Sequence, residues 1–203
     1  MADRIDYYLA LSSPWTYLAG PRFKALARRN KLDVTFRPYN IMHVFGINGT
    51  KPVAQRPKPI QANRLRELGR WHAFLGMPLN LKPKFFPVDP TLAGKMLIAA
   101  QRTGAAGDKV IDLSFAFLSA CWAEERNLAD DDTLVAIAND AGFDGGALLK
   151  SAKAGAADAE FDRNTEDALA NDVFGSPTWM FMGELFWGQD RLEFLTRTVE
   201  GGS

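Results

Sequence analysis

The sequence of 203 residues contains a single cysteine, Cys121, and only two histidines, His43 and His72. One cysteine cannot form an intramolecular disulfide, so a disulfide framework is excluded. Cys121 lies in an apolar stretch with a helical pattern, which favours a buried, unreactive thiol over a nucleophile. The histidines stand far apart, with no cysteine or carboxylate at ligand spacing, so we expect no metal site.

The chain also lacks net charge and long apolar runs. Lys plus Arg equals 24 and Asp plus Glu equals 24, which gives a formal net charge of zero. This balance argues against nucleic acid or an anionic membrane as the main partner. There is no uninterrupted run of about 18 apolar residues, and the N-terminal residues lack the apolar core of a signal peptide. We therefore expect a cytoplasmic protein with no membrane partner and no nucleic-acid partner.

Two common catalytic signatures are absent as well. No G-x-S-x-G elbow of a serine hydrolase occurs in the sequence. No glycine-rich nucleotide loop occurs either. Hydrolysis through a catalytic triad and dinucleotide chemistry are therefore disfavoured.

The first forty residues are typical of a strand, a helix and a second strand. The apolar run over 5–11 predicts a buried strand. A helix is predicted over 14–30, with Ser13 as N-cap and Pro14 at the first helical position. The alternating segment 32–39 predicts the next strand. This order begins a parallel unit.

The middle of the chain changes character. A loop rich in glycine and proline is predicted over 46–60, and helical patterns then continue to about residue 167. Strands return as a predicted hairpin over 178–187, with its turn at Gly183-Glu184, before a last helix over 191–200. This order predicts one α/β sheet interrupted by a helical insertion. Helices are predicted within the insertion around 65–75 and over 91–102, 108–125, 131–141 and 143–154.

The segment Ser13-Pro14-Trp15-Thr16 lies where the first strand meets the first helix. Free N–H groups and the helix dipole favour negative charge at that place. A Cys-Pro-x-Cys sequence there would be a redox motif, but Ser13 and Thr16 carry hydroxyls and cannot form a disulfide. The junction can still stabilise a thiolate that a ligand brings, with Ser13 as hydrogen-bond donor. A plain helix cap is the alternative interpretation of Ser13.

A second chemical segment, Trp187-Gly188-Gln189-Asp190, ends a strand and precedes a helix. Its N–H groups could bind a carboxylate, and Asp190 could pair with an ammonium group. A γ-glutamyl group carries both charges on one carbon. The alternatives are that Asp190 caps the last helix and that Trp187 packs against its neighbours.

Together these segments resemble the family of 2-hydroxychromene-2-carboxylate isomerases and kappa-class glutathione transferases. The family begins with a strand followed by S-P-[FYW]-[ST]-Y-L, which residues 13–18 match, and the likeness extends over nearly the whole chain. The late part of the resemblance rests on Thr165, Ala168, Phe174-Gly175, Pro177-Thr178, Gly183-Glu184, Phe186-Trp187-Gly188 and Asp190-Arg191-Leu192.

The resemblance implies an α/β fold: a thioredoxin-like (DsbA-like) domain with an inserted all-helical domain. The thioredoxin-like domain would comprise 1–45 and 168–203, and the insertion 46–167. The resemblance also implies a cis Ser176–Pro177 bond facing Ser13, and a homodimer. Ser13 would be the catalytic residue and glutathione the cofactor. Glutathione would be bound by Ser13, Ser176, Trp187, Gly188, Gln189 and Asp190.

On the substrate side, the resemblance implies a small aromatic or electrophilic substrate near Thr50 and either Lys51 or Lys58. Thr50 stands where the family has an asparagine, and Asn63 where it often has a tyrosine. The implied activity is a glutathione-dependent isomerase of 2-hydroxychromene-2-carboxylate type, acting in aromatic-compound catabolism. The alternatives are a kappa-class-like glutathione transferase that conjugates electrophiles, a DsbA-like thiol–disulfide oxidoreductase relative, and a non-catalytic glutathione-binding protein. The missing cysteines at 13 and 16 argue against the oxidoreductase.

Overall fold

The computed structural model describes residues 3–201. Its four strands form one mixed sheet in the order β2-β1-β3-β4. Strand β1 (Arg4–Leu9) pairs in parallel with β2 (Asp33–Pro38) and antiparallel with β3 (Thr178–Phe181). Strand β4 (Glu184–Trp187) pairs antiparallel with β3 at the edge. The first strand thus lies inside the sheet. It pairs with a strand of the late hairpin, which is almost the whole chain length away in sequence.

Helices account for the rest of the regular structure. Helix α1 (Pro14–Asn30) joins β1 to β2, and a short 3₁₀ helix, η2 (Gln189–Arg191), leads into the last helix, α9 (Leu192–Val199). The connection from β2 to β3 is helical, as the sequence predicts, and the thioredoxin-like fold class is confirmed; the division into two domains stays a prediction. This connection contains α2 (Ile41–Ile47), η1 (Val53–Gln55), α3 (Lys58–Leu75), α4 (Thr91–Arg102), α5 (Gly107–Trp122), α6 (Asp131–Asp140), α7 (Gly145–Lys153) and α8 (Asp158–Ala170).

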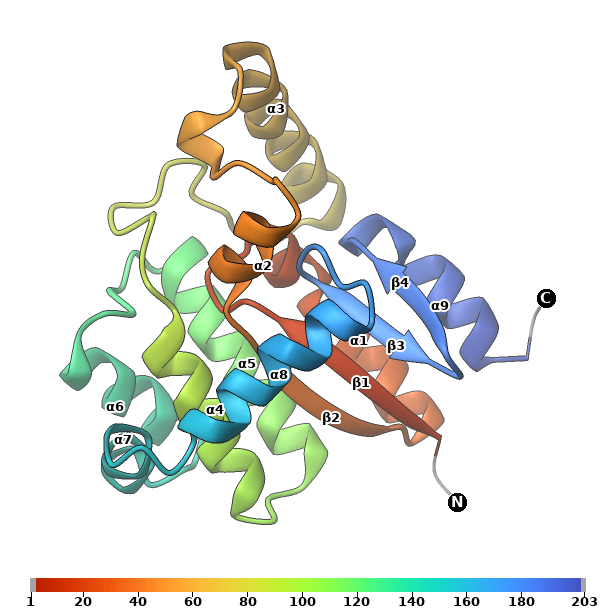
Figure 1. The fold of residues 1–203 in the computed structure, drawn as a ribbon. Coiled ribbons are helices and arrows are strands. Elements are labelled where there is room, and N and C mark those ends of the chain that lie inside the picture. Colours follow the sequence, from red (N-terminus) through yellow and green to blue (C-terminus); the bar gives the residue numbers. More distant parts are fainter. Residues whose placement is uncertain (1–2, 202–203) are drawn as a thin grey trace.

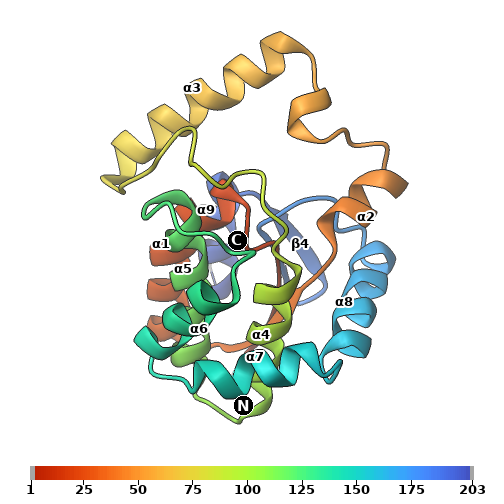
Figure 2. The ribbon, with the colours of Figure 1, turned by 90° about the vertical axis from the view of Figure 1, so that its left-hand side faces the viewer.

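The sheet lies between two layers of helices. Helices α1 and α9 lie on one face, and α8 crosses the other face (Figure 1). Figure 2 shows α3 lying across the top of the molecule, with the segment from α3 to α4 running beneath it. In residues 3–201 no helix is long and apolar enough to span a membrane.

An aromatic cluster fills the space between the sheet and α1. Tyr7 of β1 stacks on Trp179 of β3 with ring centroids 5.4 Å apart, and Phe23 of α1 lies 4.7 Å from Tyr7. All three side chains are buried. Burying each large apolar side chain stabilises the fold by about 1.5–3 kcal/mol. The cluster therefore fixes α1, and with it the N-terminus of that helix, relative to the sheet.

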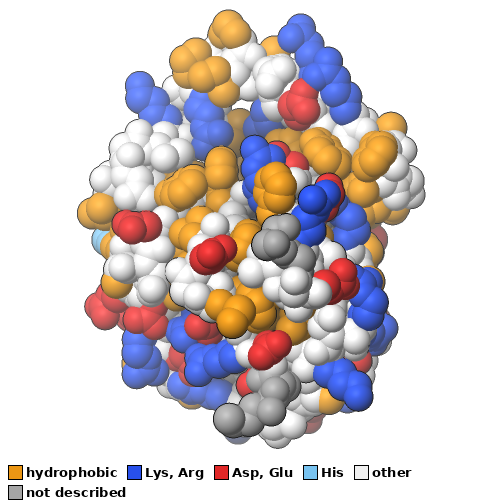
Figure 3. Space-filling view, turned by 90° about the vertical axis from the view of Figure 1, so that its right-hand side faces the viewer, with side chains coloured by type: hydrophobic (Ala, Val, Ile, Leu, Met, Phe, Trp, Pro, Cys, Tyr) orange, Lys and Arg blue, Asp and Glu red, His pale blue; other side chains and the backbone are white. Residues whose placement is uncertain are grey.

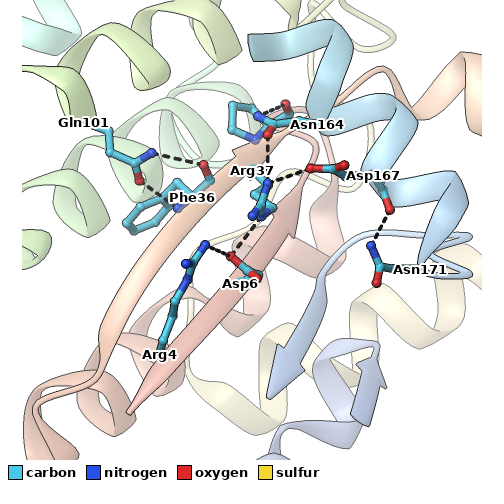
Figure 4. A network of polar contacts seen from close by, with 9 residues as sticks. Arg4, Asp6, Phe36, Arg37, Gln101, Asn164, Asp167 and Asn171 are labelled. Carbon is cyan, nitrogen blue, oxygen red and sulfur yellow. Dashed lines mark hydrogen bonds and ion pairs between the residues drawn. The ribbon is translucent and has the colours of Figure 1, made fainter. Parts of the chain in front are cut away.

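Polar contacts attach α8 to the opposite face of the sheet (Figure 4). Arg37 of β2 donates from Nε to Asp6 of β1 at 2.9 Å and from Nη1 to Asp167 of α8 at 3.0 Å. Gln101 of α4 accepts from the N–H of Phe36 at 2.8 Å, at the outer edge of β2. This amide occupies a backbone donor that an edge strand would otherwise expose.

Two predictions of local structure need correction. The hairpin turn is Met182-Gly183 rather than Gly183-Glu184, and both turn residues have positive φ, 52° and 83°. Paired positive φ values are typical of a tight two-residue turn that matches the strand twist. The predicted loop 46–60 overlaps the end of α2, contains η1, and runs into α3, which begins at Lys58. Asn40 starts α2 by accepting a hydrogen bond from the N–H of His43, at 3.0 Å.

Two glycines in helices should respond in opposite ways to alanine. In α1 a Cβ on Gly20 would lie 2.4 Å from the ring of Phe115, which stacks on Tyr17, whereas a Cβ on Gly69 in α3 would contact nothing within 4 Å. We expect Gly20→Ala to lower the free energy of unfolding by about 1–3 kcal/mol through overpacking. Gly69→Ala should raise it by about 0.5–1 kcal/mol through helix propensity. Urea denaturation of both variants tests this, and a stabilised Gly20→Ala would contradict the packing of α1 on α5.

Candidate active site at the N-terminus of helix α1

Ser13 is the N-cap of α1, as the sequence predicts. Its backbone is extended, with φ −84° and ψ 123°, and its Oγ accepts a hydrogen bond from the N–H of Thr16 at 3.3 Å. Pro14 occupies the first helical position, where its missing N–H costs nothing. The helix therefore begins with a partly exposed hydroxyl at the positive end of its dipole.

The loop before β3 lies against this hydroxyl. The Ser176–Pro177 bond is cis, and Ser13 Oγ donates a hydrogen bond to the carbonyl oxygen of Ser176 at 3.1 Å. The expectation that this bond is cis and faces Ser13 is thus confirmed. A serine hydroxyl has one proton, and here that proton is directed at the Ser176 carbonyl. A competing acceptor placed beside Ser13 would release that carbonyl to accept a different donor.

The side chain of Ser176 points away from Ser13 and into the protein. Its Oγ accepts from the N–H of Ala10 at 2.8 Å and lies 2.6 Å from Oγ1 of Thr16. Both side chains are buried. The two hydroxyls thus join the end of β1, the first turn of α1 and the loop before β3. Only the backbone of Ser176 is directed to the site, which agrees with a ligand contact through main-chain atoms.

Trp187 and Gly188 pack against the same loop. A Cβ on Gly175 would lie 2.2 Å from Nε1 of Trp187, so only glycine allows the indole to approach this closely. The N–H of Gly188 donates to the carbonyl of Pro177 at 2.9 Å. That N–H is therefore already occupied, which leaves the following N–H groups of the segment 187–190 for a carboxylate.

Gln189 and Asp190 have different surroundings. Gln189 is 2% exposed, and its side chain and backbone oxygens both accept from Nη2 of Arg22, whose guanidinium lies 5.7 Å from the ring of Trp71. The carboxylate of Asp190 is half-exposed and pairs with Arg191 at 2.7 Å. Burial lowers the pKa of Arg22, and the charge of Asp190 partly offsets this. Asp190 is thus the accessible acid of the segment, whereas the Gln189 side chain is part of the interior.

The predicted substrate residues lie on another part of the chain. Thr50 and Lys51 follow α2, and Lys58 is the first residue of α3. The N–H of Thr50 donates to the carbonyl of Phe45 at 2.9 Å, and both lysine side chains are exposed. Within the described range, none of the three forms a hydrogen bond or ion pair with Ser13 or Ser176. Their contact with a ligand stays a prediction.

Two side chains that support the start of α1 have no signal in the sequence pattern. Trp122, at the end of α5, donates from Nε1 to the carbonyl of Ser12 at 3.2 Å, next to the cap residue. Tyr17 of α1 donates to the carbonyl of Pro78 at 2.6 Å. These contacts attach the start of α1 to the helical insertion, and their long sequence separation hides them from pattern analysis.

Hydrophobic side chains gather in the middle of the face near β4 and α9 (Figure 3). Trp187 of β4 is 46% exposed, and Phe194 of α9 is 55% exposed. Across residues 3–201, no group of three or more histidine, cysteine, aspartate or glutamate side chains is arranged to hold a metal ion.

The model of the DSBA-like thioredoxin domain matches residues 4–200, and the chain belongs to this family. A 2-hydroxychromene-2-carboxylate isomerase from Pseudomonas putida is 30% identical over 195 residues, covering 94% of this chain and 91% of the relative. Another, from Sphingobium xenophagum, is 28% identical over 200 residues, covering 96% and 97%.

The solved structures agree on the fold. A 2-hydroxychromene-2-carboxylate isomerase superimposes with a TM-score of 0.79 at 22% identity, covering 98% of this chain and 95% of that one. The predicted resemblance to the isomerases is therefore confirmed over the length of the chain.

The contribution of the hydrogen-bonded hydroxyls of Thr16 and Ser176 can be tested by measuring stability. Ser176→Ala leaves the buried N–H of Ala10 without its acceptor, so we expect the free energy of unfolding to fall by about 1–3 kcal/mol. Thr16→Val should lower the free energy of unfolding less in the Ser176→Ala variant than in the unmodified protein, because the hydroxyl partner of Thr16 is already gone. Thr198→Val, near the end of α9, is the control and should change stability by no more than about 0.5 kcal/mol. Equal unfolding midpoints for Ser176→Ala and the control would contradict this arrangement.

Cys121 should be inert in the folded protein. The side chain is 2% exposed, and burial raises the pKa of its thiol to about 12. At pH 8 the thiol is therefore protonated, and iodoacetamide should label it only after unfolding in guanidinium. Mass spectrometry of folded and unfolded samples measures this, and rapid labelling of the folded protein would refute the buried placement.

Proposed function

We propose that this protein is a glutathione-dependent isomerase acting on 2-hydroxychromene-2-carboxylate or a related aromatic acid. The observation that carries the proposal is the hydrogen bond from Ser13 Oγ to the Ser176 carbonyl at the N-terminus of α1. The names of the relatives, at 28–30% identity over nearly the whole chain, support the reaction type.

The residues present fit glutathione. A peptide with a thiol needs a donor for its sulfur and an acceptor for the neighbouring N–H, and Ser13 Oγ and Ser176 O are 3.1 Å apart. When bound, glutathione supplies a thiolate nucleophile that adds to a conjugated carbon of the substrate and is later expelled unchanged. Ser13 rotates its proton from Ser176 O to the sulfur, and the first-turn N–H groups of α1 add positive potential.

The Ser176 carbonyl, once released, accepts the peptide N–H. Asp190 holds the ammonium of the γ-glutamyl end, since its carboxylate is half-exposed. The N–H groups that follow Gly188 hold the adjacent carboxylate, and Trp187 lies beside them as a wall. Gln189 acts through its backbone, because its side chain accepts from Arg22. Ser13 is the catalytic residue in this scheme, and Ser176, Trp187, Gln189 and Asp190 bind the cofactor, while the N–H of Gly188 is used by the carbonyl of Pro177.

A disulfide oxidoreductase is a poor match for the same site. The two positions of the redox motif are Ser13 and Thr16, and the hydroxyl of Thr16 is bonded to Ser176 inside the protein. Cys121 is buried in α5. A transferase shares the thiolate site but consumes glutathione, so the stoichiometry of glutathione during turnover distinguishes the two activities. The homodimer, the cytoplasmic location and the role in aromatic-compound catabolism stay predictions.

Replacing the Ser13 hydroxyl tests the mechanism. Ser13→Ala removes the donor to sulfur, and a loss of about 1.4 kcal/mol of thiolate stabilisation raises the pKa of the bound glutathione thiol by about one unit. Thiolate absorbance at neutral pH and isomerase turnover should then both decrease. The fold should persist, because losing one helix cap costs about 0.5–2 kcal/mol.

Ser12→Ala is the matched control. It keeps the backbone carbonyl that accepts from Trp122, and its side chain makes no hydrogen bond within residues 3–201. The control should retain both thiolate absorbance and turnover. Normal turnover and an unchanged thiol pKa in Ser13→Ala would reduce Ser13 to a structural cap.

A further inference from the structure

Arg64 is a partly buried cation of α3 without an anionic partner. Its guanidinium carbon lies 5.6 Å from the ring centroid of Phe86 and 5.9 Å from that of Trp122. Among the residues that the structure describes, it forms no hydrogen bond and no ion pair. None of its nitrogen atoms is sealed from solvent without a partner, in contrast to Nε of Arg22. The donors of Arg64 are thus both unused and reachable.

Other partly buried arginines of this protein are paired. Arg37 bonds to Asp6 and Asp167, and Arg22 to the two oxygens of Gln189. Packing an arginine on aromatic rings is favourable without any anion. This packing explains the position of the stem and plane of Arg64, but leaves its donors unexplained.

The electrostatic cost at Arg64 is visible in its ionisation. Burial, with a smaller contribution from the nearby charge of Arg56, lowers the pKa of Arg64 to about 10. The guanidinium therefore keeps its charge at neutral pH in surroundings that disfavour it. A second cation nearby, and no acid bonded to it, make this place attractive to an anion from solution.

The aromatic side chains below Arg64 connect it to the candidate active site. Phe86 and Trp122 pack with ring centroids 4.8 Å apart, and Nε1 of Trp122 donates to the carbonyl of Ser12. The segment that carries Phe86 runs beneath α3 (Figure 2), and the N–H of Asn80 within it donates to the carbonyl of Trp122 at 2.7 Å. These rings therefore form a fixed surface between Arg64 and the start of α1.

We propose that Arg64 binds the carboxylate of the aromatic substrate, whose ring lies against the partly exposed ring of Phe86, while the fully buried Trp122 supports Phe86 from behind. This inference rests on the proposed function and names the substrate-positioning residue of that same site. A carboxylate could also come from the glycyl end of glutathione. The ring of Phe86 favours the substrate, because it matches an aromatic acid and offers nothing to a glycyl group. The planar guanidinium fork suits a carboxylate through two parallel hydrogen bonds.

Binding of a stable aromatic acid tests this without requiring turnover. The probe is coumarin-3-carboxylate, with uncharged coumarin for comparison, and tryptophan fluorescence reports binding. Arg64→Met should raise the Kd for the acid by about tenfold to hundredfold, as expected for the loss of a charged hydrogen-bonded pair. Its Kd for coumarin should stay within about twofold. Arg64→Lys should recover part of the affinity, since it keeps the charge but not the fork.

Arg66→Met, an exposed change two residues along the same helix, is the control and should bind the acid as the unmodified chain does. Glutathione affinity is measured in parallel, with glutathione and with its glycyl ethyl ester. The proposal is overturned if Arg64→Met binds coumarin-3-carboxylate normally, if the unmodified chain does not bind it, or if only glutathione affinity falls and the ester is unaffected. If Arg64→Met loses affinity for coumarin-3-carboxylate but the unmodified chain shows no isomerase turnover, the Arg64 site is upheld and the proposed function is refuted.

Discussion

The structure depends on the meeting of two chain segments that are far apart in sequence: the first turn of α1 and the loop that precedes β3. Ser13 bonds to the backbone of Ser176, while the side chain of Ser176 bonds to Ala10 and contacts Thr16. The parallel pairing of β1 with β2 and its antiparallel pairing with β3 bring these segments to one end of the sheet. The aromatic cluster under α1 fixes the helix at the angle that this contact requires.

This contact also sets the chemistry that the site can perform. Hydroxyls at positions 13 and 16 remove any possibility of a disulfide there, yet the helix terminus keeps its affinity for negative charge. The Thr16 hydroxyl is used inside the protein, so a single exposed hydroxyl, that of Ser13, faces the site. Because that hydroxyl has one proton, sulfur and the Ser176 carbonyl compete for it. A ligand that brings both a thiolate and a neighbouring N–H would therefore take the Ser13 proton and give the Ser176 carbonyl a new donor, so that no group would be left unpaired.

Local sequence patterns predicted much of this arrangement because its determinants are local. Ser13 and Pro14 define the start of α1 through cap chemistry, and 14–30 are the bounds that the structure has. The hairpin was placed correctly, but its turn was not, because apolar Met182 continues the strand pattern while lying exposed in the turn. Helix α2 was missed because it is short and begins in a region with turn-forming residues. The packing of Arg22 on Trp71 and of Arg64 on Phe86 could not be predicted, since tertiary packing alone brings α3 over α1 and the segment before α4.

The position of Arg64 bears on how one site can accommodate two anions. The helix N-terminus favours a thiolate, and an aromatic acid brought next to it would raise the pKa of that thiol by like-charge repulsion. Arg64 packs on Trp122, which in turn donates a hydrogen bond to Ser12 at the start of α1. Within the described residues, Arg64 forms no ion pair with an acidic side chain. In the proposed function, neutralising the substrate carboxylate at Arg64 would keep that charge from raising the pKa of the attacking thiol. In the proposed function the unpaired cation and the helix terminus would act together: Arg64 would hold the charge of the substrate, and the N-terminus of α1 the charge of the nucleophile.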